Sequence, residues 1–251
     1  MKEDIVELLH TREMEWVWKQ VARVLKIYFR VQTTGVKNIP KSGPVIIAPN
    51  HSGVAGFDQV VLAHVLRTKT KRPPVTLAHR AYFDFSPMRG RLSESFGLRK
   101  ASLETGHNCL KQNKLLVLFP EGERGNFKSS TKAYHLQKFR TGFLRLAIMN
   151  KAPIVPCTIV GAEESHLNLG NIDLSRFMKD IRIPIPLNLI PLPAKWKIRF
   201  WDPIDPSRYP LELANQKNEI EKSARMIRRL MQIYLHQELK RRKYVYFPFL
   251  K

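Results

Sequence analysis

The chain has 251 residues, of which 43% are hydrophobic, so it is long enough for one domain with a substantial core. Its 43 lysines and arginines against 21 acidic residues give a net charge of +22, which predicts an anionic partner, either nucleic acid or an anionic bilayer. The two cysteines, Cys109 and Cys157, lack metal-ligand spacing, which argues against a disulfide framework and a zinc site and fits a reducing compartment.

The N-terminal residues predict an amphipathic helix from Ile5 to about Arg30. Apolar residues recur there at helical spacing: Met14, Val17, Trp18, Val21, Leu25 and Tyr28. This stripe could cover the core or lie in a membrane interface, and both interpretations stay open, although Trp16 beside basic residues favours the membrane. The segment lacks the order of a secretory signal, so we expect it to remain on the mature protein.

Short apolar runs in the rest of the chain predict buried strands that alternate with helices. The expected strands are Val45–Ala48, Val75–Ala78, Leu115–Phe119, Ile154–Val160 and Trp196–Phe200. The expected helices are Gln59–Arg67, Leu103–Gln112 and His135–Met149. The alternation predicts an α/β fold, an αβα sandwich around a largely parallel mixed sheet, with residues 1–34 as a separate helical segment and residues 35–251 as the main domain. Ligands of such folds bind beyond the carboxyl ends of the strands.

Two later segments have a distinctive composition. The stretch from Phe177 to Ala194 is rich in proline and apolar residues, and it either packs over the domain or dips into a bilayer, with membrane contact favoured. A long helix is expected from about Leu211 to Lys243, and the aromatic residues after its basic end suit a lipid headgroup region. We expect no membrane-spanning helix, because a span needs roughly 20 mostly apolar residues.

The first candidate site is the turn that follows the strand Val45–Ala48. It brings the imidazole of His51 and the carboxylate of Asp58 into one glycine-containing turn. A carboxylate bound to one imidazole nitrogen fixes the tautomer and raises the basicity, which leaves the other nitrogen free to take a proton from an alcohol. A plainer interpretation makes Asp58 the N-cap of the helix beginning at Gln59, and His51 a loop histidine.

A second turn, Phe119-Pro120-Glu121-Gly122-Glu123-Arg124, also ends an apolar strand. Arg124 could clamp a phosphate, and Gly122 would let the backbone approach a ligand closely. Glu121 could accept a hydrogen bond from a substrate hydroxyl or hold the turn together. Alternatively, Glu121 and Arg124 pair with each other or with neighbours.

Together with Ala152-Pro153-Ile154-Val155-Pro156, these turns occur in the order found in the glycerolipid (lysophospholipid) acyltransferase superfamily, which the chain resembles over most of its length. The resemblance to 1-acylglycerol-3-phosphate acyltransferases implies that His51 is the general base and that Asp58 orients it. It implies that Glu121, Gly122 and Arg124 bind the acceptor. By the same resemblance, Arg99 stands for the second motif of the family and Arg140 adds an anion contact.

Two departures leave the acceptor open. Six residues separate His51 from Asp58, a longer gap than is commonest in the family. The run Val160-Gly161-Ala162-Glu163-Glu164 resembles the branch that contains monoacylglycerol and diacylglycerol acyltransferase-like proteins. The general base chemistry is unaffected by either departure.

The resemblance implies an acyltransferase of phospholipid biosynthesis that moves a fatty acyl group from acyl-CoA or acyl-carrier protein to a hydroxyl of a glycerolipid, without metal or cofactor. We expect a peripheral protein on the cytoplasmic side of an anionic membrane surface. Covalent chemistry at Ser52 is disfavoured, because no Gly-x-Ser-x-Gly elbow occurs. The alternatives are a lipid-binding or hydrolytic relative and a nucleic-acid-binding basic protein, and no recognised module supports nucleic acid.

Overall fold

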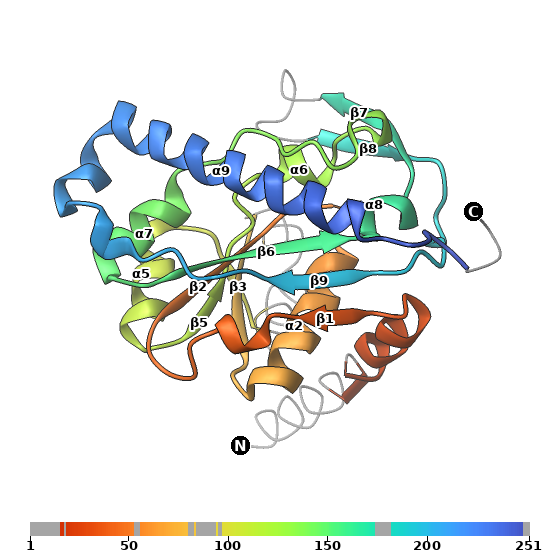
Figure 1. Cartoon of the computed structure of the whole chain (residues 1–251), viewed down its shortest axis with the longest axis horizontal. Coiled ribbons are helices and arrows are strands. Elements are labelled where there is room, and N and C mark those ends of the chain that lie inside the picture. The colour runs from red at the N-terminus through yellow and green to blue at the C-terminus, as the bar shows by residue number, and fades with distance from the viewer. Residues whose placement is uncertain are drawn as a thin grey trace.

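The computed structural model describes residues 16–17, 19–52, 56–79, 83, 94, 97–173 and 182–247. Within these residues the main sheet has seven strands in the order β1-β9-β6-β2-β5-β3-β4 (Figure 1). The strands are β1 Gln32–Thr34, β2 Val45–Pro49, β3 Pro74–Ala78, β4 Leu98–Lys100, β5 Leu115–Val117, β6 Ile154–Val160 and β9 Lys197–Phe200. Among these described strands only the β6 and β9 pair is antiparallel. The largely parallel mixed sheet is therefore confirmed.

Helices cover both faces of this sheet, because its central strands are buried on both sides. Successive β2 residues point to opposite faces, so Ile46 packs with α5 (Leu103–Lys111), α7 (Gly142–Asn150) and α9 (Lys217–Lys240). Ile47 packs on the other face, with α2 (Phe57–Thr70) and Phe29 of the N-terminal segment. Figure 1 shows α9 crossing one face of the sheet and α2 lying on the other. The αβα sandwich is thus confirmed.

The expected helix His135–Met149 is wrong in its first half, since α7 begins only at Gly142. The backbone before it is bound by side chains from elsewhere in the fold. The amide of Leu136 donates to Gln232 Oε1 at 2.9 Å, and the amide of Gln137 donates to Glu121 Oε2 at 2.6 Å. These tertiary partners replace the hydrogen bonds that a helix would have made.

The long C-terminal helix is confirmed, although it starts later than expected. A separate 3-10 helix, η4, covers Leu211–Asn215, and α9 then runs over Lys217–Lys240. The break lies at Gln216, whose ψ of 98° is extended rather than helical. Residues at helical spacing on α9 are buried against the sheet, as the pattern predicted: Ile220, Ala224, Ile227, Met231 and Leu235.

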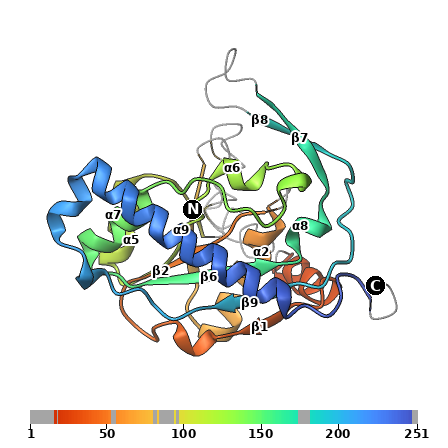
Figure 2. The ribbon, with the colours of Figure 1, turned by 45° about the horizontal axis from the view of Figure 1, so that its top comes forward.

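A two-stranded antiparallel hairpin, β7 (Asn168–Asp173) and β8 (Arg182–Pro186), extends away from the main sheet beyond α8 (Ala162–Ser165), as Figure 2 shows. The proline-rich stretch expected from Phe177 to Ala194 thus contributes a strand and the loop after it, and its residues 177–181 lie outside the described residues. Leu189 and Ile190 in that loop are 88% and 79% exposed.

The N-terminal segment is helical at residues 16–17 and 19–28, while residues 1–15 and Trp18 lie outside the described part. Its apolar residues divide between two faces. Ala22 and Phe29 are buried, whereas Val24 and Ile27 are 62% and 69% exposed. No helix among the described residues is both long and apolar enough to cross a bilayer.

Candidate active site

The two predicted turns lie together at one edge of the sheet. His51 follows β2 and Glu121 follows β5, and these strands are parallel neighbours. Their carboxyl ends therefore meet, as they do at the ligand sites of open α/β sheets. The backbone amide of His51 donates a hydrogen bond to Glu121 Oε1 at 2.9 Å, which joins the turns directly.

His51 and Asp58 form a hydrogen-bonded pair in which Nδ1 of the imidazole lies 2.7 Å from Asp58 Oδ2. The same oxygen accepts from the backbone amide of Ser52 at 2.9 Å, and Oδ1 accepts from the amide of Gln59 at 2.8 Å. Asp58 is fully buried, while 12% of the His51 side chain is exposed. The carboxylate is therefore held in place and the imidazole keeps an open edge.

The plainer interpretation of Asp58 as a helix N-cap is wrong. The N-cap of α2 is Gly56, in the left-handed region at φ 69° and ψ 19°, which glycine adopts without a steric penalty. Asp58 lies in the first helical turn, where the positive end of the helix dipole favours a negative charge. One oxygen of its side chain, Oδ2, turns back to His51, while the other, Oδ1, binds the Gln59 amide within the first turn. Residues 53–55, between His51 and Asp58, lie outside the described part.

Two further side chains fix the orientation of this turn. The Phe119 ring packs on the His51 imidazole, with centroids 4.1 Å apart and planes inclined by 32°. Asn50 is fully buried and bridges to β6, donating to the Ile159 carbonyl at 3.0 Å and accepting from the Ile159 amide at 2.7 Å. Phe119 thus packs on the ring face of the imidazole, and Asn50 ties the backbone just before His51 to β6.

Glu121 is fully buried, and its two carboxylate oxygens accept hydrogen bonds from backbone amides. Oε1 binds the amide of His51, and Oε2 binds the amide of Gln137. Of the two roles that the sequence left open, this geometry favours holding the turn together over binding a substrate hydroxyl.

Gly122 and Arg140 meet beside this turn, and Arg124 follows it. Gly122 has φ 57° and ψ −149°, and a Cβ built on it would lie 3.2 Å from Arg140 Nε. The amide of Arg140 donates to the Pro120 carbonyl at 2.8 Å. Arg140 is exposed, and so is Arg124 in the short helix α6 (Glu123–Asn126). Two exposed guanidinium groups therefore border the turn, where an anion could approach them.

Arg99 is not brought to His51. It lies in the edge strand β4, and β3 and β5 separate that strand from β2, a distance of roughly 14 Å at the usual strand spacing. Its Nη1 donates to the carbonyls of Glu94 and Leu98 at 2.6 and 2.8 Å.

Sequence reasoning missed several residues around the site. His79 follows β3, and its Nε2 lies 3.0 Å from Glu123 Oε1. Behind the turn that carries His51, the Lys128 ammonium lies 2.8 Å from Glu163 Oε1, with both side chains buried. The Glu163-Glu164 run was the one signal in the sequence that could have pointed there.

The pKa of Glu163 is raised from its ordinary value of 4.5 to about 7. Burial is the largest cause, and the negative charge of Glu121 adds to it, while Lys128 and the Tyr134 amide act in the opposite direction. Burial, followed by the charges of Glu164 and Glu163, also raises the pKa of the Tyr134 hydroxyl well above its ordinary value.

Comparison with known proteins identifies a family that the chain matches. The model of the family described as Acyltransferase matches residues 30–160. An uncharacterised protein of Mycobacterium tuberculosis is 33% identical over 88% of this chain and 65% of its own length, so the chain spans about two thirds of that relative. A protein of Homo sapiens, named as an enzyme synthesizing storage lipids, is 25% identical over 78% of this chain and 61% of its own length.

The fold has a counterpart among solved structures. The crystal structure of the 1-acyl-sn-glycerophosphate acyltransferase of Thermotoga maritima superposes with a TM-score of 0.58 at 19% identity, and covers 92% of this chain and 83% of that one. This likeness shows that the two proteins share a fold.

Proposed function

The chain belongs to the acyltransferase family, and from that premise we propose that it transfers a fatty acyl group to a hydroxyl of a glycerolipid, with His51 as the general base. The observation that carries this proposal is the 2.7 Å contact between His51 Nδ1 and the buried Asp58 carboxylate. That contact presents the other imidazole nitrogen, Nε2, as the proton acceptor.

The mechanism follows from this arrangement. Nε2 of His51 takes the proton of the acceptor hydroxyl while the hydroxyl oxygen attacks the thioester carbonyl of the acyl donor. The new C–O bond forms, the C–S bond breaks, and the imidazolium returns its proton to the leaving thiolate. Asp58 stabilises the imidazolium between the two steps. No acyl-enzyme intermediate is needed, and Ser52, which is 1% exposed, is poorly placed to form one.

The exposed guanidinium groups of Arg124 and Arg140 at the Glu121-Gly122 turn favour substrates that carry anionic groups. We propose acyl-CoA or acyl-carrier protein as the donor and a lysophospholipid as the acceptor. A neutral glycerolipid is the second candidate, supported by the longer gap between His51 and Asp58 and by the similarity to an enzyme named for storage-lipid synthesis.

We propose that the protein acts as a peripheral enzyme at an anionic membrane surface on the cytoplasmic side. Two exposed apolar segments lie side by side, because the Tyr28 hydroxyl donates to the Pro191 carbonyl at 2.7 Å. One is the N-terminal helical segment and the other is the loop after β8. Their exposed apolar residues are Trp16, Val24, Ile27, Leu187, Leu189 and Ile190. With a net charge of +22, these residues support contact with anionic lipid.

Replacing His51 by alanine tests the general base directly. Acyl transfer from acyl-CoA and acyl-carrier protein is measured on a panel of lysophospholipids, monoacylglycerol and diacylglycerol. We expect His51→Ala to lose about 10²- to 10⁴-fold in kcat, the usual contribution of a positioned base. The exposed His135, replaced in the same way, serves as the matched control.

Two results would contradict the proposal. Turnover retained in a folded His51→Ala protein would remove His51 from the chemistry. Thiol release from the donor at an undiminished rate when no acceptor is present would instead indicate a hydrolase.

A further inference from the structure

A buried lysine stands directly behind the catalytic turn. The Lys128 side chain is 4% exposed, and its ammonium lies 2.8 Å from Glu163 Oε1 and 4.0 Å from Glu121 Oε2. Both carboxylate side chains are buried, at 5% and 0% exposure. Two buried carboxylates therefore share one cation. Its removal would leave two buried carboxyl groups with no cation between them, so that they would have to stay charged without a partner or take up a proton, and either is unfavourable.

The cluster is connected to the catalytic histidine through Glu121. The carboxylate near Lys128 is the one that accepts the hydrogen bond from the His51 amide. A shift of Glu121 would therefore move the backbone of His51, and with it the imidazole. Because a misplacement of about 1 Å can cost about 10²-fold in rate, the charge behind Glu121 bears on the chemistry.

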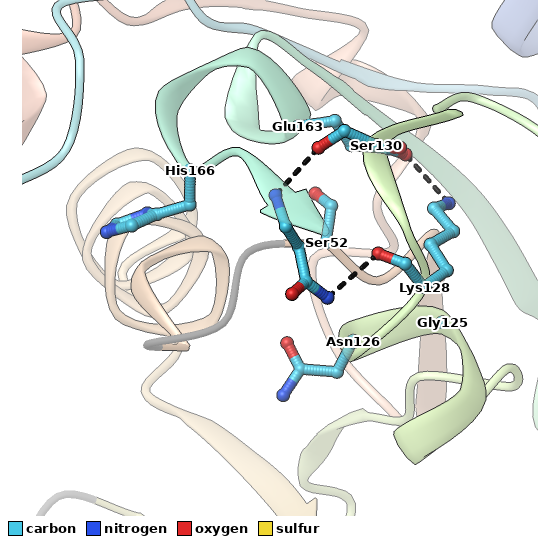
Figure 3. Close-up of a pocket in the computed structure, with 8 residues that line it drawn as sticks. Ser52, Gly125, Asn126, Lys128, Ser130, Glu163 and His166 are labelled. Carbon is cyan, nitrogen blue, oxygen red and sulfur yellow. Dashed lines mark hydrogen bonds and ion pairs between the residues drawn. The ribbon is translucent and has the colours of Figure 1, made fainter. Parts of the chain in front are cut away.

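Lys128 also adjoins the other half of the catalytic turn. Together with Ser52 and Asn126, it lines a cavity of about 10 Å³ (Figure 3). This cavity has room for a single water molecule. Within the described part of the chain, Ser52 Oγ and Asn126 Oδ1 have no hydrogen-bond partner in the protein. The amide of Ser52 donates to Asp58, so this cavity lies against the residue that follows His51 and helps to hold its carboxylate partner.

The far side of the cluster is firmly anchored. Glu163 Oε2 accepts from the Tyr134 amide at 2.8 Å, and the Tyr134 hydroxyl accepts from the Gly161 amide at 2.8 Å. That hydroxyl donates to Glu164, which is also paired with Arg242, two residues after the end of α9. In Figure 3 the Lys128 ammonium points toward Glu163, across the pocket from His166. Glu163 is thus held in place by Tyr134, and it in turn holds the Lys128 ammonium.

We propose that Lys128 is a positioning residue for acyl transfer: held by Glu163, its ammonium fixes the Glu121 carboxylate and, through it, the catalytic histidine His51. This inference rests on the proposed role of His51 as the general base. In this inference, Glu163 of the Glu163-Glu164 run holds Lys128, and Glu164 holds Tyr134, which in turn binds Glu163.

Three variants test this proposal. Lys128→Met keeps the length of the side chain and removes its charge. Lys128→Met combined with Glu163→Gln also removes one of the two buried carboxylates, and is therefore expected to fold even where the single variant does not. Lys132→Met removes an exposed lysine from the same loop and serves as the control. Melting temperature, kcat and KM are measured for each variant.

A positioning role predicts that kcat falls about 10- to 100-fold in Lys128→Met, while KM changes by less than about 2-fold. In the double variant the melting temperature recovers and kcat stays low. Lys132→Met matches the wild type. Recovery of kcat together with the melting temperature in the double variant would mean that the pair only stabilises the fold, and would overturn the proposal.

A second readout does not depend on the proposed reaction. Nitrogen NMR of the His51 ring, assigned with His51→Ala, reports on the hydrogen bond between Nδ1 and Asp58. We expect this resonance to shift in Lys128→Met and in the double variant, and to be unchanged in Lys132→Met. An unshifted resonance in both Lys128 variants would overturn the positioning role. Absence of acyl transfer by the wild type, with the shift present, would instead refute only the proposed function.

Discussion

At the scale of single residues, the geometry of the candidate site depends on side chains that hold backbone groups in place. Asp58 binds the amide of Ser52 as well as the His51 ring, and Glu121 binds the amides of His51 and Gln137. Each carboxylate thus binds at least one backbone amide in the segment that follows β2. Both carboxylates are fully buried, as groups that hold backbone amides in place can be.

Gly122→Ala tests the turn at this scale. The glycine has a positive φ of 57°, and the new Cβ would lie 3.2 Å from Arg140 Nε. We expect a loss of about 1–3 kcal/mol in the free energy of unfolding, because a side chain is strained in that backbone region. The matched control is Gly142→Ala in α7, where a Cβ meets nothing within 4 Å. Urea denaturation of both proteins gives the comparison, and equal stabilities would argue against strain at Gly122.

At the scale of elements, α8 and α9 hold the segment that follows the turn of Glu121 and Gly122. Glu163 and Glu164 of α8 bind Tyr134, and Gln232 of α9 donates to the Tyr134 carbonyl at 2.8 Å. Arg228 of α9 donates to the Leu136 carbonyl at 2.9 Å. The segment therefore takes its shape from two helices that follow it in the chain.

The raised pKa of Glu163 makes this bracing dependent on pH. Burial raises its pKa to about 7 in the folded protein, against 4.5 as its ordinary value. Between these values the folded state holds a proton that the unfolded state has lost, so this group makes folding less favourable as the pH rises from about 4.5 to about 7. Above about pH 7 its contribution is constant.

Glu163→Gln removes this titration. We expect the free energy of unfolding of the variant, minus that of the wild type, to rise with pH across the window from about 4.5 to about 7 and then to level off. Urea denaturation over that range measures the difference. Parallel curves for the two proteins would show that Glu163 titrates alike in the folded and unfolded states.

At the scale of the whole molecule, the protein has a strongly basic net charge and also exposes apolar side chains on segments that lie next to each other. The N-terminal helical segment and the loop after β8 are linked by Tyr28 and Pro191, and the Arg30 guanidinium binds the carbonyls of Pro193 and Tyr246. The C-terminal aromatic residues therefore approach the same region. Such a surface suits the boundary between lipid headgroups and acyl chains.

Sedimentation with vesicles tests this surface. We expect the protein to bind anionic vesicles and to be released by high salt, since each basic residue near the surface contributes about 1 kcal/mol. Leu189→Asp with Ile190→Asp should weaken binding, whereas Leu211→Asp, at a residue that is 62% exposed in η4, should not. Equal binding to neutral vesicles would contradict the electrostatic part of the proposal, and unchanged binding of the Leu189/Ile190 variant would contradict the role of the loop.

Local patterns in the chain were sufficient for the fold class. The strands β2, β3, β5, β6 and β9 were predicted to within two residues at each end. The first four are buried along their whole length and are therefore continuously apolar, whereas β9 alternates buried and half-buried residues. The helix expected at His135 failed because its apolar spacing is satisfied by packing in an extended segment, whose amides bind Gln232 and Glu121. Periodicity cannot reveal such partners, which are distant in the chain.

The sequence by itself determined the residue types at two strand ends: an imidazole with a carboxylate in one turn, and a carboxylate beside a glycine in the other. The tertiary structure decided which of them meet. Because β2 and β5 are parallel neighbours, His51 and Glu121 are joined, while Arg99 stays on the edge strand. The fold also buries Lys128 between two carboxylates, an arrangement that depends on burial and distance, and no local pattern of residues encodes either.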